Sequence, residues 1–277
     1  MPTPMTHPEI CKPPNLVSRM LRWLNFANPE DVMYRIARDN VHYMNYGLSK
    51  KDDPRPDTID RAEENNYLEL LSLAGLMPPA DTLNFLEIGC GFGYGSQLIN
   101  SVFRPKGILA IDLVPNAIRY ANSKWNNPNV VYRNQRFSRD TAEANNIDLI
   151  YTVESGGYFP DQEAFHASFG MLKKGGVFLV ASINPIEELR RKKEYALAAG
   201  FELAGERDVT AEVLSYLHSE AKSRKFYSLL DKVPFMQRLL CRLFMRRLKD
   251  LTRMPGSMAI KRLGTSEFYY HFCFRKA

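Results

Sequence analysis

A glycine-rich turn that joins an apolar run to a helical segment is the most informative stretch of the sequence. Leu83–Ile88 leads directly into Gly89, Gly91 and Gly93, and Glu87 stands two positions before the first glycine. Residues without a Cβ let the backbone turn tightly and approach a bound molecule that a side chain would exclude. The pattern predicts a strand, a ligand-binding turn and a helix in that order.

A single carboxylate strengthens this interpretation. Asp112 ends the next apolar run, 19 residues after Gly93, where a carboxylate can bind both ribose hydroxyls of a nucleoside. Tight packing of strand against helix would also explain the glycines, but it does not require Asp112. Dinucleotide sites favour G-x-G-x-x-G, whereas here Tyr94 occupies the place of the later glycine.

The glycine loop with its upstream Glu87 resembles motif I of the class I S-adenosylmethionine-dependent methyltransferases. The resemblance implies S-adenosylmethionine as cofactor, with the glycine turn facing its methionine part and Asp112 its ribose. The family often has Gly-Asp after the third core strand, where this sequence has Gln135 and Arg136. Gln135 is therefore the substitute candidate for contact with the adenine.

Two shorter segments indicate a branch of that family. His42–Leu48 (HYMNYGL) resembles the N-terminal segment of methyltransferases that act on tocopherols, sterols, quinones and polyketides, and implies that Tyr46 covers the methionine part. The stretch from Ala199 to Thr210 resembles the region before their helical lid. Those relatives end in an aromatic strand followed by Arg-Lys, as this sequence does at Arg275-Lys276.

The loop after the predicted fourth strand offers the catalytic candidates, Glu154 and Tyr158. Ligands of open α/β sheets bind beyond the carboxyl ends of the strands, which places both side chains near the reacting centre. Many relatives carry histidine at or beside the position of Tyr158. Glu154 could support a base or bind the methionine end, or only bond to backbone, and Tyr158 could line the substrate or only pack.

The expected cofactor-binding residues come from all of these segments. They are Tyr46, Glu87, Gly89, Gly91, Gly93, Asp112, Leu113, Gln135 and Glu154.

Methyl transfer from a sulfonium is an in-line displacement, so the enzyme must align the reactants and exclude water. A hydroxyl acceptor also needs a general base. A carbon acceptor needs aromatic faces or carboxylates near a developing positive charge.

Short apolar runs that alternate with helical patterns position these residues and predict an α/β protein with parallel crossovers. The expected strands are 83–88, 108–113, 130–134, 147–153, 177–183, 201–207 and 267–274. The expected helices are 16–26, 28–44, 59–73, 93–103, 115–125, 139–145, 161–173 and 186–199. The resemblance makes this a Rossmann-like, doubly wound, seven-stranded sheet whose last strand is antiparallel.

Four parts are expected along the chain. Residues 1–56 form a disordered leader and an N-terminal helical cap, and 57–208 form the S-adenosylmethionine-binding core. Residues 209–262 form a basic, amphipathic helical lid, and 263–277 supply the final core strand.

Composition excludes several classes of protein. Hydrophobic residues make up 45% and charged residues 25% of the 277 residues, which is typical of a soluble globular protein. The four cysteines show no paired spacing, so we expect neither a disulfide framework nor a metal site. No apolar run is long enough to span a bilayer and the N-terminus lacks an apolar signal region, so we expect a cytoplasmic protein.

The net charge of +6 is concentrated in one segment. Residues 222–262 carry 12 basic and two acidic residues, which leaves 25 basic and 29 acidic residues elsewhere. Within it, 235–249 has a helical period, with Arg238, Arg242, Arg246 and Lys249 opposite an apolar face. We expect a lid helix over the pocket. A sharper hypothesis is peripheral contact with an anionic membrane.

The sequence therefore predicts an enzyme that moves a methyl group from S-adenosylmethionine to oxygen or carbon of a lipophilic small molecule. A nucleic-acid methyltransferase is one alternative, but the Asn/Asp-Pro-Pro-aromatic loop of base-amino methyltransferases is missing after the fourth strand, so no nucleic-acid partner is expected. A catalytically inactive, cofactor-binding, membrane-associated protein is the other. The sequence leaves the oligomeric state open.

Overall fold

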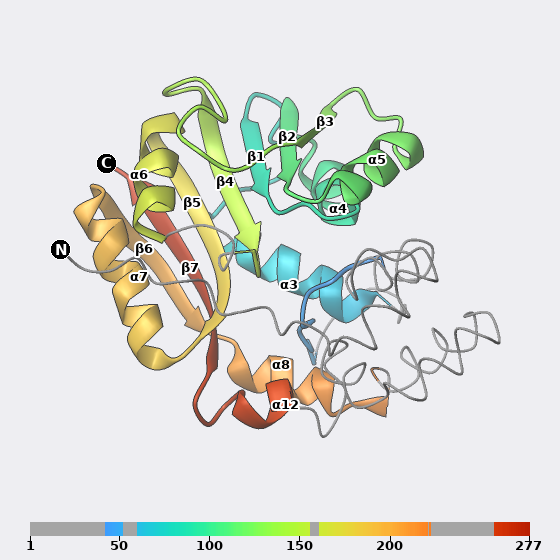
Figure 1. Ribbon diagram of the computed structural model, residues 1–277, viewed down its shortest axis with the longest axis vertical. Coiled ribbons are helices and arrows are strands. Elements are labelled where there is room, and N and C mark those ends of the chain that lie inside the picture. Colours follow the sequence, from blue (N-terminus) through green and yellow to red (C-terminus); the bar gives the residue numbers. More distant parts are fainter. Residues whose placement is uncertain (1–41, 52–59, 156–160, 221, 223–257) are drawn as a thin grey trace, which may run out of the picture.

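A seven-stranded sheet forms the centre of the computed structural model, which describes residues 42–51, 60–155, 161–220, 222 and 258–277 (Figure 1). The strands are β1 (Asn84–Ile88), β2 (Gly107–Asp112), β3 (Val130–Asn134), β4 (Ile147–Val153), β5 (Leu172–Asn184), β6 (Phe201–Asp208) and β7 (Phe268–Lys276). Their order in the sheet is β3-β2-β1-β4-β5-β7-β6.

Strands β1 to β5 pair in parallel, and β7 lies antiparallel between β5 and β6. The chain turns in opposite directions from β1, toward β2 on one side and β4 on the other. The carboxyl ends of neighbouring β1, β2 and β4 meet at this reversal, where open α/β sheets bind their ligands. The predicted doubly wound sheet with an antiparallel last strand is confirmed.

Helices cover both faces of the sheet (Figure 1). They are α3 (Arg61–Ser72), α4 (Tyr94–Phe103), α5 (Pro115–Lys124), α6 (Asp161–Met171), α7 (Ile186–Ala198), α8 (Thr210–Leu217) and α12 (Met258–Arg262). Helices α3, α4 and α5 share one hydrophobic core with the sheet, and α6 and α7 share the other. A strand between two cores must point its side chains alternately into one and the other. In β7, Tyr269 and Cys273 face the first core, while Phe272 and Phe274 face the second.

The predicted helix over 139–145 is wrong. Between β3 and β4 the chain forms turns, in which the Ser138 N–H donates to Thr141 Oγ1 at 2.9 Å and the Thr141 N–H donates to the Ser138 carbonyl at 3.0 Å. Such bonds compete with a helix, and the segment has no large apolar residue to hold one against the sheet. The face of β3 is left uncovered here, and Val131 is 48% exposed.

The predicted helix over 16–26 and most of the one over 28–44 lie outside the described residues. Residues 42–44 are not helical, so the predicted end at Met44 is wrong. The predicted stop of helix 59–73 is confirmed, since α3 ends at Ser72 and Gly75 follows with a φ of 67°. None of the described helices is both long and apolar enough to span a bilayer.

A buried ion pair fixes α7 to the beginning of α6. The Lys192 Nζ atom lies 2.7 and 2.6 Å from the two carboxylate oxygens of Asp161, and the Lys192 side chain is 5% exposed.

We expect Lys192→Ala to lower the free energy of unfolding by about 2–3 kcal/mol, because it leaves the Asp161 carboxylate largely buried without its cation. Arg190→Ala on the same helix is the matched control. It breaks a pair with Glu187 in which both side chains are more than half exposed, and should cost about 0.5 kcal/mol or less. Urea unfolding followed by circular dichroism measures both; equal losses would contradict the structural role of Lys192.

Candidate functional site

The glycine loop between β1 and α4 is built from left-handed backbone. Gly89, Gly91 and Gly93 have φ angles of 79°, 53° and 81°, a region that favours glycine. A Cβ on Gly89 would lie 1.9 Å from Ser155 Oγ, and one on Gly93 would lie 2.6 Å from Tyr132 Oη. Packing within the protein therefore requires glycine at these two positions.

Gly91 differs from its two neighbours. The nearest atom to a Cβ added there is the Met44 methyl carbon, at 3.0 Å, and no other heavy atom of the described residues lies within 4 Å. Gly91 is itself buried, and the atom nearest to an added Cβ is the flexible end of Met44, so a bound molecule must displace this side chain to reach Gly91. Cys90 is buried within the turn, and burial raises the pKa of its thiol, so it is not a nucleophile.

The Asp112 carboxylate ties the loop to the end of β2. It accepts the Gly91 N–H and the Val114 N–H, each at 2.8 Å. Burial raises the pKa of this carboxyl, and the backbone donors Val114, Gly91 and Leu113 oppose that shift. A carboxylate has about four acceptor positions, so three backbone donors leave capacity for a ribose hydroxyl.

Leu113 and Gln135 flank this carboxylate, as predicted from their places in the sequence. The Gln135 N–H donates to the Asp112 carbonyl at 3.1 Å, and Leu113 is 44% exposed. An exposed apolar side chain beside a ribose-binding carboxylate is suited to pack against a nucleobase. The assignment of these two residues to the adenine stays a prediction.

Glu87 lies beneath the loop. Its side chain is 1% exposed, accepts the Ser96 hydroxyl, and accepts the Tyr151 hydroxyl at 3.1 Å. Burial raises its pKa to about 7, against the hydroxyl donors Ser96, Tyr151 and Tyr67, which lower it. Because Ser96 belongs to α4, Glu87 fixes that helix to β1; its predicted contact with the cofactor stays untested.

Glu154 stands at the carboxyl end of β4 in a left-handed conformation, with a φ of 60°. Its Oε1 atom accepts the Tyr46 N–H at 2.6 Å and the Tyr269 hydroxyl at 2.8 Å. The Tyr46 ring is buried and meets the Tyr269 ring edge-on, with the centroids 6.0 Å apart. The structure thus brings together Tyr46 and Glu154, two predicted site residues 108 positions apart.

The other catalytic candidate, Tyr158, lies outside the described residues. His166 is exposed on α6.

The segment 42–48 reaches this place because its asparagine and glycine fix it to the helices. The Asn45 amide donates to the Glu63 carbonyl of α3 at 3.2 Å, and its Oδ1 accepts the Gly47 N–H at 2.8 Å. Gly47 has a φ of 75°, and a Cβ there would lie 2.4 Å from the Tyr216 ring of α8. The Asn-Tyr-Gly motif therefore holds Tyr46 over the end of β4.

Sequence reasoning missed several residues of this site. Asp60 bonds His42 Nδ1, and the His42 ring stacks on Tyr94 at 4.3 Å. Tyr269 also accepts from Asn66, which in turn bonds His271. The only signal in the sequence is that Tyr269 and His271 alternate with apolar residues in a strand and so share one of its faces.

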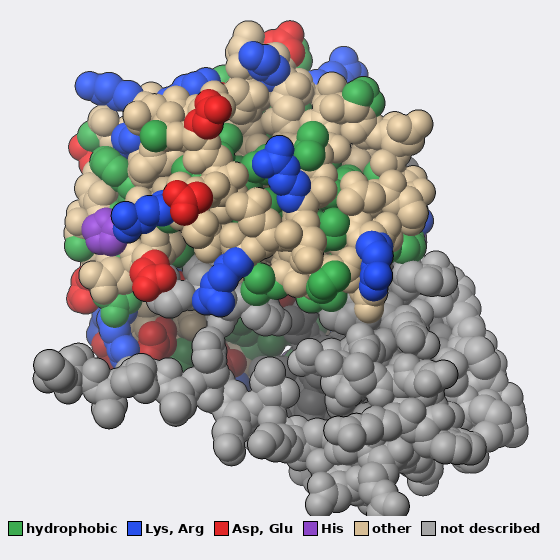
Figure 2. Space-filling view, turned by 45° about the horizontal axis from the view of Figure 1, so that its top comes forward, with side chains coloured by type: hydrophobic (Ala, Val, Ile, Leu, Met, Phe, Trp, Pro, Cys, Tyr) green, Lys and Arg blue, Asp and Glu red, His purple; other side chains and the backbone are tan. Residues whose placement is uncertain are grey.

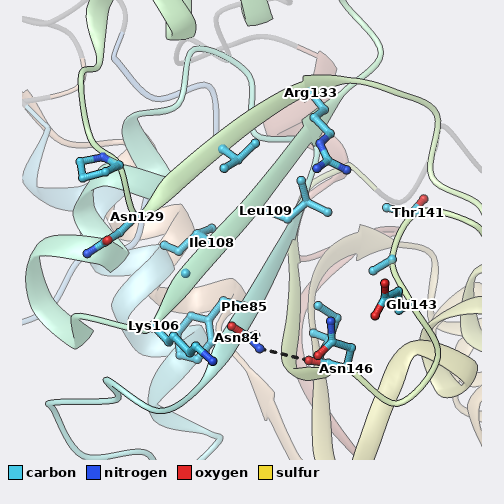
Figure 3. A pocket seen from close by; sticks show the side chains of 15 residues that line it. Asn84, Phe85, Lys106, Ile108, Leu109, Asn129, Arg133, Thr141, Glu143 and Asn146 are labelled. Atoms are coloured by element: carbon cyan, nitrogen blue, oxygen red, sulfur yellow. Dashed lines mark hydrogen bonds between the residues drawn. The ribbon is translucent and has the colours of Figure 1, made fainter.

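A groove of about 380 Å³ lies elsewhere, along the uncovered face of β2 and β3. Figure 3 shows Ile108 and Leu109 along its floor and Lys106 and Arg133 near its two ends. Asn84, Gly107 and Ile147, which begin their strands, also line it. It therefore extends to the amino ends of the strands and away from the glycine loop. Across the described ranges, no three His, Cys, Asp or Glu side chains gather as metal ligands would.

Comparison with known proteins decides the class of the site. Residues 85–176, which include the glycine loop, Asp112 and Glu154, match the family model described as "Methyltransferase domain". The chain is an S-adenosylmethionine-dependent methyltransferase. It is 26% identical over 182 residues to the probable phthiotriol/phenolphthiotriol dimycocerosates methyltransferase 2 of Mycobacterium ulcerans, covering 65% of this chain and 70% of that one.

Other relatives and solved structures agree with the class of this methyltransferase. The erythromycin 3''-O-methyltransferase of Saccharopolyspora erythraea is 28% identical over 151 residues, 52% of this chain and 47% of that one. A cyclopropane synthase of Mycobacterium tuberculosis shares the fold with a TM-score of 0.65 and 14% identity, covering 86% of this chain and 94% of that one. The geranyl diphosphate C-methyltransferase of Streptomyces coelicolor A3(2) also shares the fold, with a TM-score of 0.61 and 14% identity, covering 91% of this chain and 99% of that one.

The residues present fit the cofactor of a methyltransferase. An added Cβ at Gly91 would meet only the flexible end of Met44, the Asp112 carboxylate has acceptor capacity at the end of β2, and Leu113 offers an exposed apolar surface beside it. These features lie along one edge of the sheet, in the order that a methionine, a ribose and a base would require.

The raised pKa of Glu87 predicts a specific pH dependence of stability. Between the ordinary value of 4.5 and the folded value of about 7, the native protein keeps a proton that the unfolded chain has released. Wild-type stability should therefore fall as pH rises through this window, by about 2–3 kcal/mol relative to Glu87→Gln, which cannot ionise. Urea unfolding at pH 5 and pH 8 measures the difference. Glu143→Gln, at an exposed carboxylate, is the control; parallel pH profiles for wild type and Glu87→Gln would refute the prediction.

Proposed function

We propose that this methyltransferase transfers the methyl group to an oxygen or carbon atom of a lipophilic small molecule of natural-product, sterol, quinone or prenyl type. The observation that carries the proposal is the meeting of Tyr46, Glu154 and Tyr269 at the carboxyl end of β4, next to the glycine loop. Two aromatic rings and a carboxylate there suit an apolar acceptor that develops positive charge or must lose a proton.

The relatives support the lipophilic class. Those at 25–28% identity are named for phthiotriol lipids, erythromycin and, in Synechocystis, 2-methyl-6-phytyl-1,4-hydroquinone. The name of the erythromycin enzyme also gives the acceptor atom, an oxygen. None of the names refers to a nucleic acid.

Seven of the predicted site residues have a role in this proposal. Asp112 would bind the ribose, Leu113 and Gln135 the adenine, and Gly91 the methionine part, with Tyr46 and the segment 42–48 excluding water. When bound, S-adenosylmethionine supplies a methyl group on a positively charged sulfur, and the acceptor supplies the electron pair for the new bond. Glu154 faces this step as an anion or supports the base; Tyr158 is proposed to line the acceptor.

We also propose that two segments close the pocket, an N-terminal cap within 1–56 and a lid within 209–262. Helix α8, at the start of the lid, is bonded to α3 through the Tyr216 hydroxyl, which donates to Glu63 Oε1 at 2.9 Å. A lid fixed to the core at its first helix is suited to cover the end of β4.

A nucleic-acid substrate is not favoured. The loop after β4 begins with Glu154 and Ser155 and lacks the Asn/Asp-Pro-Pro-aromatic pattern. On the face drawn in Figure 2, basic and acidic side chains lie singly among uncharged surface, with no broad basic area on the described residues.

We expect the purified protein to add one methylene mass, about 14 daltons, to at least one member of a panel of lipophilic alcohols, phenols and alkenes. Intact-mass detection of the acceptor after incubation with S-adenosylmethionine measures this. Asp112→Ala should weaken cofactor binding about 10- to 100-fold in calorimetry, because it removes charge-assisted hydrogen bonds.

Asp140→Ala is the matched control, since it removes an exposed carboxylate from the turns after β3. Unchanged cofactor affinity in a folded Asp112→Ala protein would overturn the cofactor site. Cofactor binding with no methylated product across the panel would favour the inactive cofactor-binding protein instead.

We further propose peripheral contact with anionic membrane through 235–249, a segment that lies outside the described residues. Wild-type protein should co-sediment with vesicles that contain phosphatidylserine several-fold more than with phosphatidylcholine vesicles. Replacement of Arg238, Arg242, Arg246 and Lys249 by Gln should remove the excess. Replacement of Arg190 and Arg191, exposed on α7, should not. Equal binding to both vesicles, or none, rejects the contact.

A further inference from the structure

A buried chain of hydrogen bonds runs from strand β7 to the carboxylate of Glu154. His271 Nε2 lies 2.8 Å from Asn66 Oδ1, Asn66 Nδ2 lies 2.7 Å from the Tyr269 hydroxyl, and that hydroxyl lies 2.8 Å from Glu154 Oε1. The side chains of Asn66, Tyr269 and His271 are fully buried. We call these three residues the Tyr269 chain.

The chemistry of the partners gives the Tyr269 chain a single direction. An ionised carboxylate only accepts, so Tyr269 donates its one proton to Glu154 and its oxygen accepts from the Asn66 amide. The Asn66 carbonyl then faces His271, so Nε2 of that ring must carry the proton. Burial, followed by the charge of Arg207, lowers the pKa of His271 to about 3, which keeps the ring neutral near pH 7.

Packing alone does not require such a chain. The opposite face of β7 is filled by Phe272 and Phe274, which need no hydrogen-bond partner. Buried polar groups cost stability unless their bonds are well made, and here the donors all point toward one carboxylate. That carboxylate belongs to a residue whose φ of 60° is unfavourable for a side chain with a Cβ.

Tyr269 also connects the two covers of the site. Its N–H donates to Thr210 Oγ1 at 2.8 Å and its carbonyl accepts the Val209 N–H at 2.9 Å, at the first turn of α8. The Glu154 oxygen that it contacts also accepts the Tyr46 N–H. The start of α8, the segment 42–48 and the end of β4 are therefore connected through Tyr269 and the Glu154 oxygen that it contacts.

We propose that Tyr269 is a positioning residue for methyl transfer, with Asn66 and His271 behind it. Its hydroxyl fixes the direction in which the Glu154 carboxylate faces the reacting centre. The inference rests on the proposed role of Glu154 in the transfer. It assigns to the last strand a function that neither the glycine loop nor the loop after β4 supplies.

The test is Tyr269→Phe, which removes one oxygen atom and keeps the ring. We expect kcat to fall about tenfold, because a charged acceptor loses one donor. The KM for the acceptor and the calorimetric affinity for S-adenosylmethionine should stay within about twofold. Tyr270→Phe is the matched control, since this neighbouring hydroxyl bonds Asp208 on the other face of β7 and should leave kcat unchanged.

A double-mutant cycle separates positioning from a merely structural role. In a Glu154→Gln background, where turnover is followed by product mass over hours, Tyr269→Phe should lower kcat no further. Asn66→Leu, one bond further from Glu154, should lower kcat by about threefold and should also lose its effect in that background. If a thermal melt shows that Tyr269→Phe is poorly folded, the Asn66→Leu variant tests the same inference.

Two results would overturn the inference while leaving the proposed function intact. One is wild-type kcat in folded Tyr269→Phe; the other is an equal loss of kcat in the wild-type and Glu154→Gln backgrounds. A protein that methylates no acceptor at all would instead remove the proposed function, so the two failures are distinguishable.

Discussion

The hydrogen bonds that converge on Glu154 Oε1 hold the functional edge of this protein together. One comes from the backbone of Tyr46 and one from the hydroxyl of Tyr269, and the partners are separated by 108 and 115 positions in the chain. A β4 that ended in an apolar residue would leave the segment 42–48 and the last strand without a shared acceptor. Because this oxygen accepts from both, the segment 42–48 and the last strand are fixed relative to β4, which carries the candidate catalytic carboxylate.

Two buried titratable groups lie behind this edge, and burial shifts their pKa values in opposite directions. Under the glycine loop, burial raises the pKa of Glu87 to about 7, and in β7 it lowers the pKa of His271 to about 3. In both cases the neutral form is favoured, because water no longer solvates the charge. Near neutral pH His271 is therefore uncharged, and Glu87 carries only part of a full negative charge.

The distribution of charge along the chain agrees with a compact core and a separate basic segment. The excess of basic residues lies between 222 and 262, and the remainder of the chain is slightly acidic. A general affinity for polyanions would require basic side chains across the core, and the face in Figure 2 shows both signs interspersed. The charge of +6 thus belongs to a segment within the predicted lid and says little about the catalytic core.

The sequence by itself determined the order of strands and helices, the glycine loop and Asp112, because hydrophobic periodicity and glycine spacing act over a few residues. It also predicted Tyr46 and Glu154 through short motifs, although not that they touch. It was wrong at 139–145, where Ser138 and Thr141 form a turn and no apolar stripe holds a helix against the sheet. Only the tertiary structure decided that Asn66, Tyr269 and His271 align on Glu154. The insertion of β7 between β5 and β6 sets which of its side chains reach α3 and β4, and a register between strands so distant in sequence leaves no local pattern.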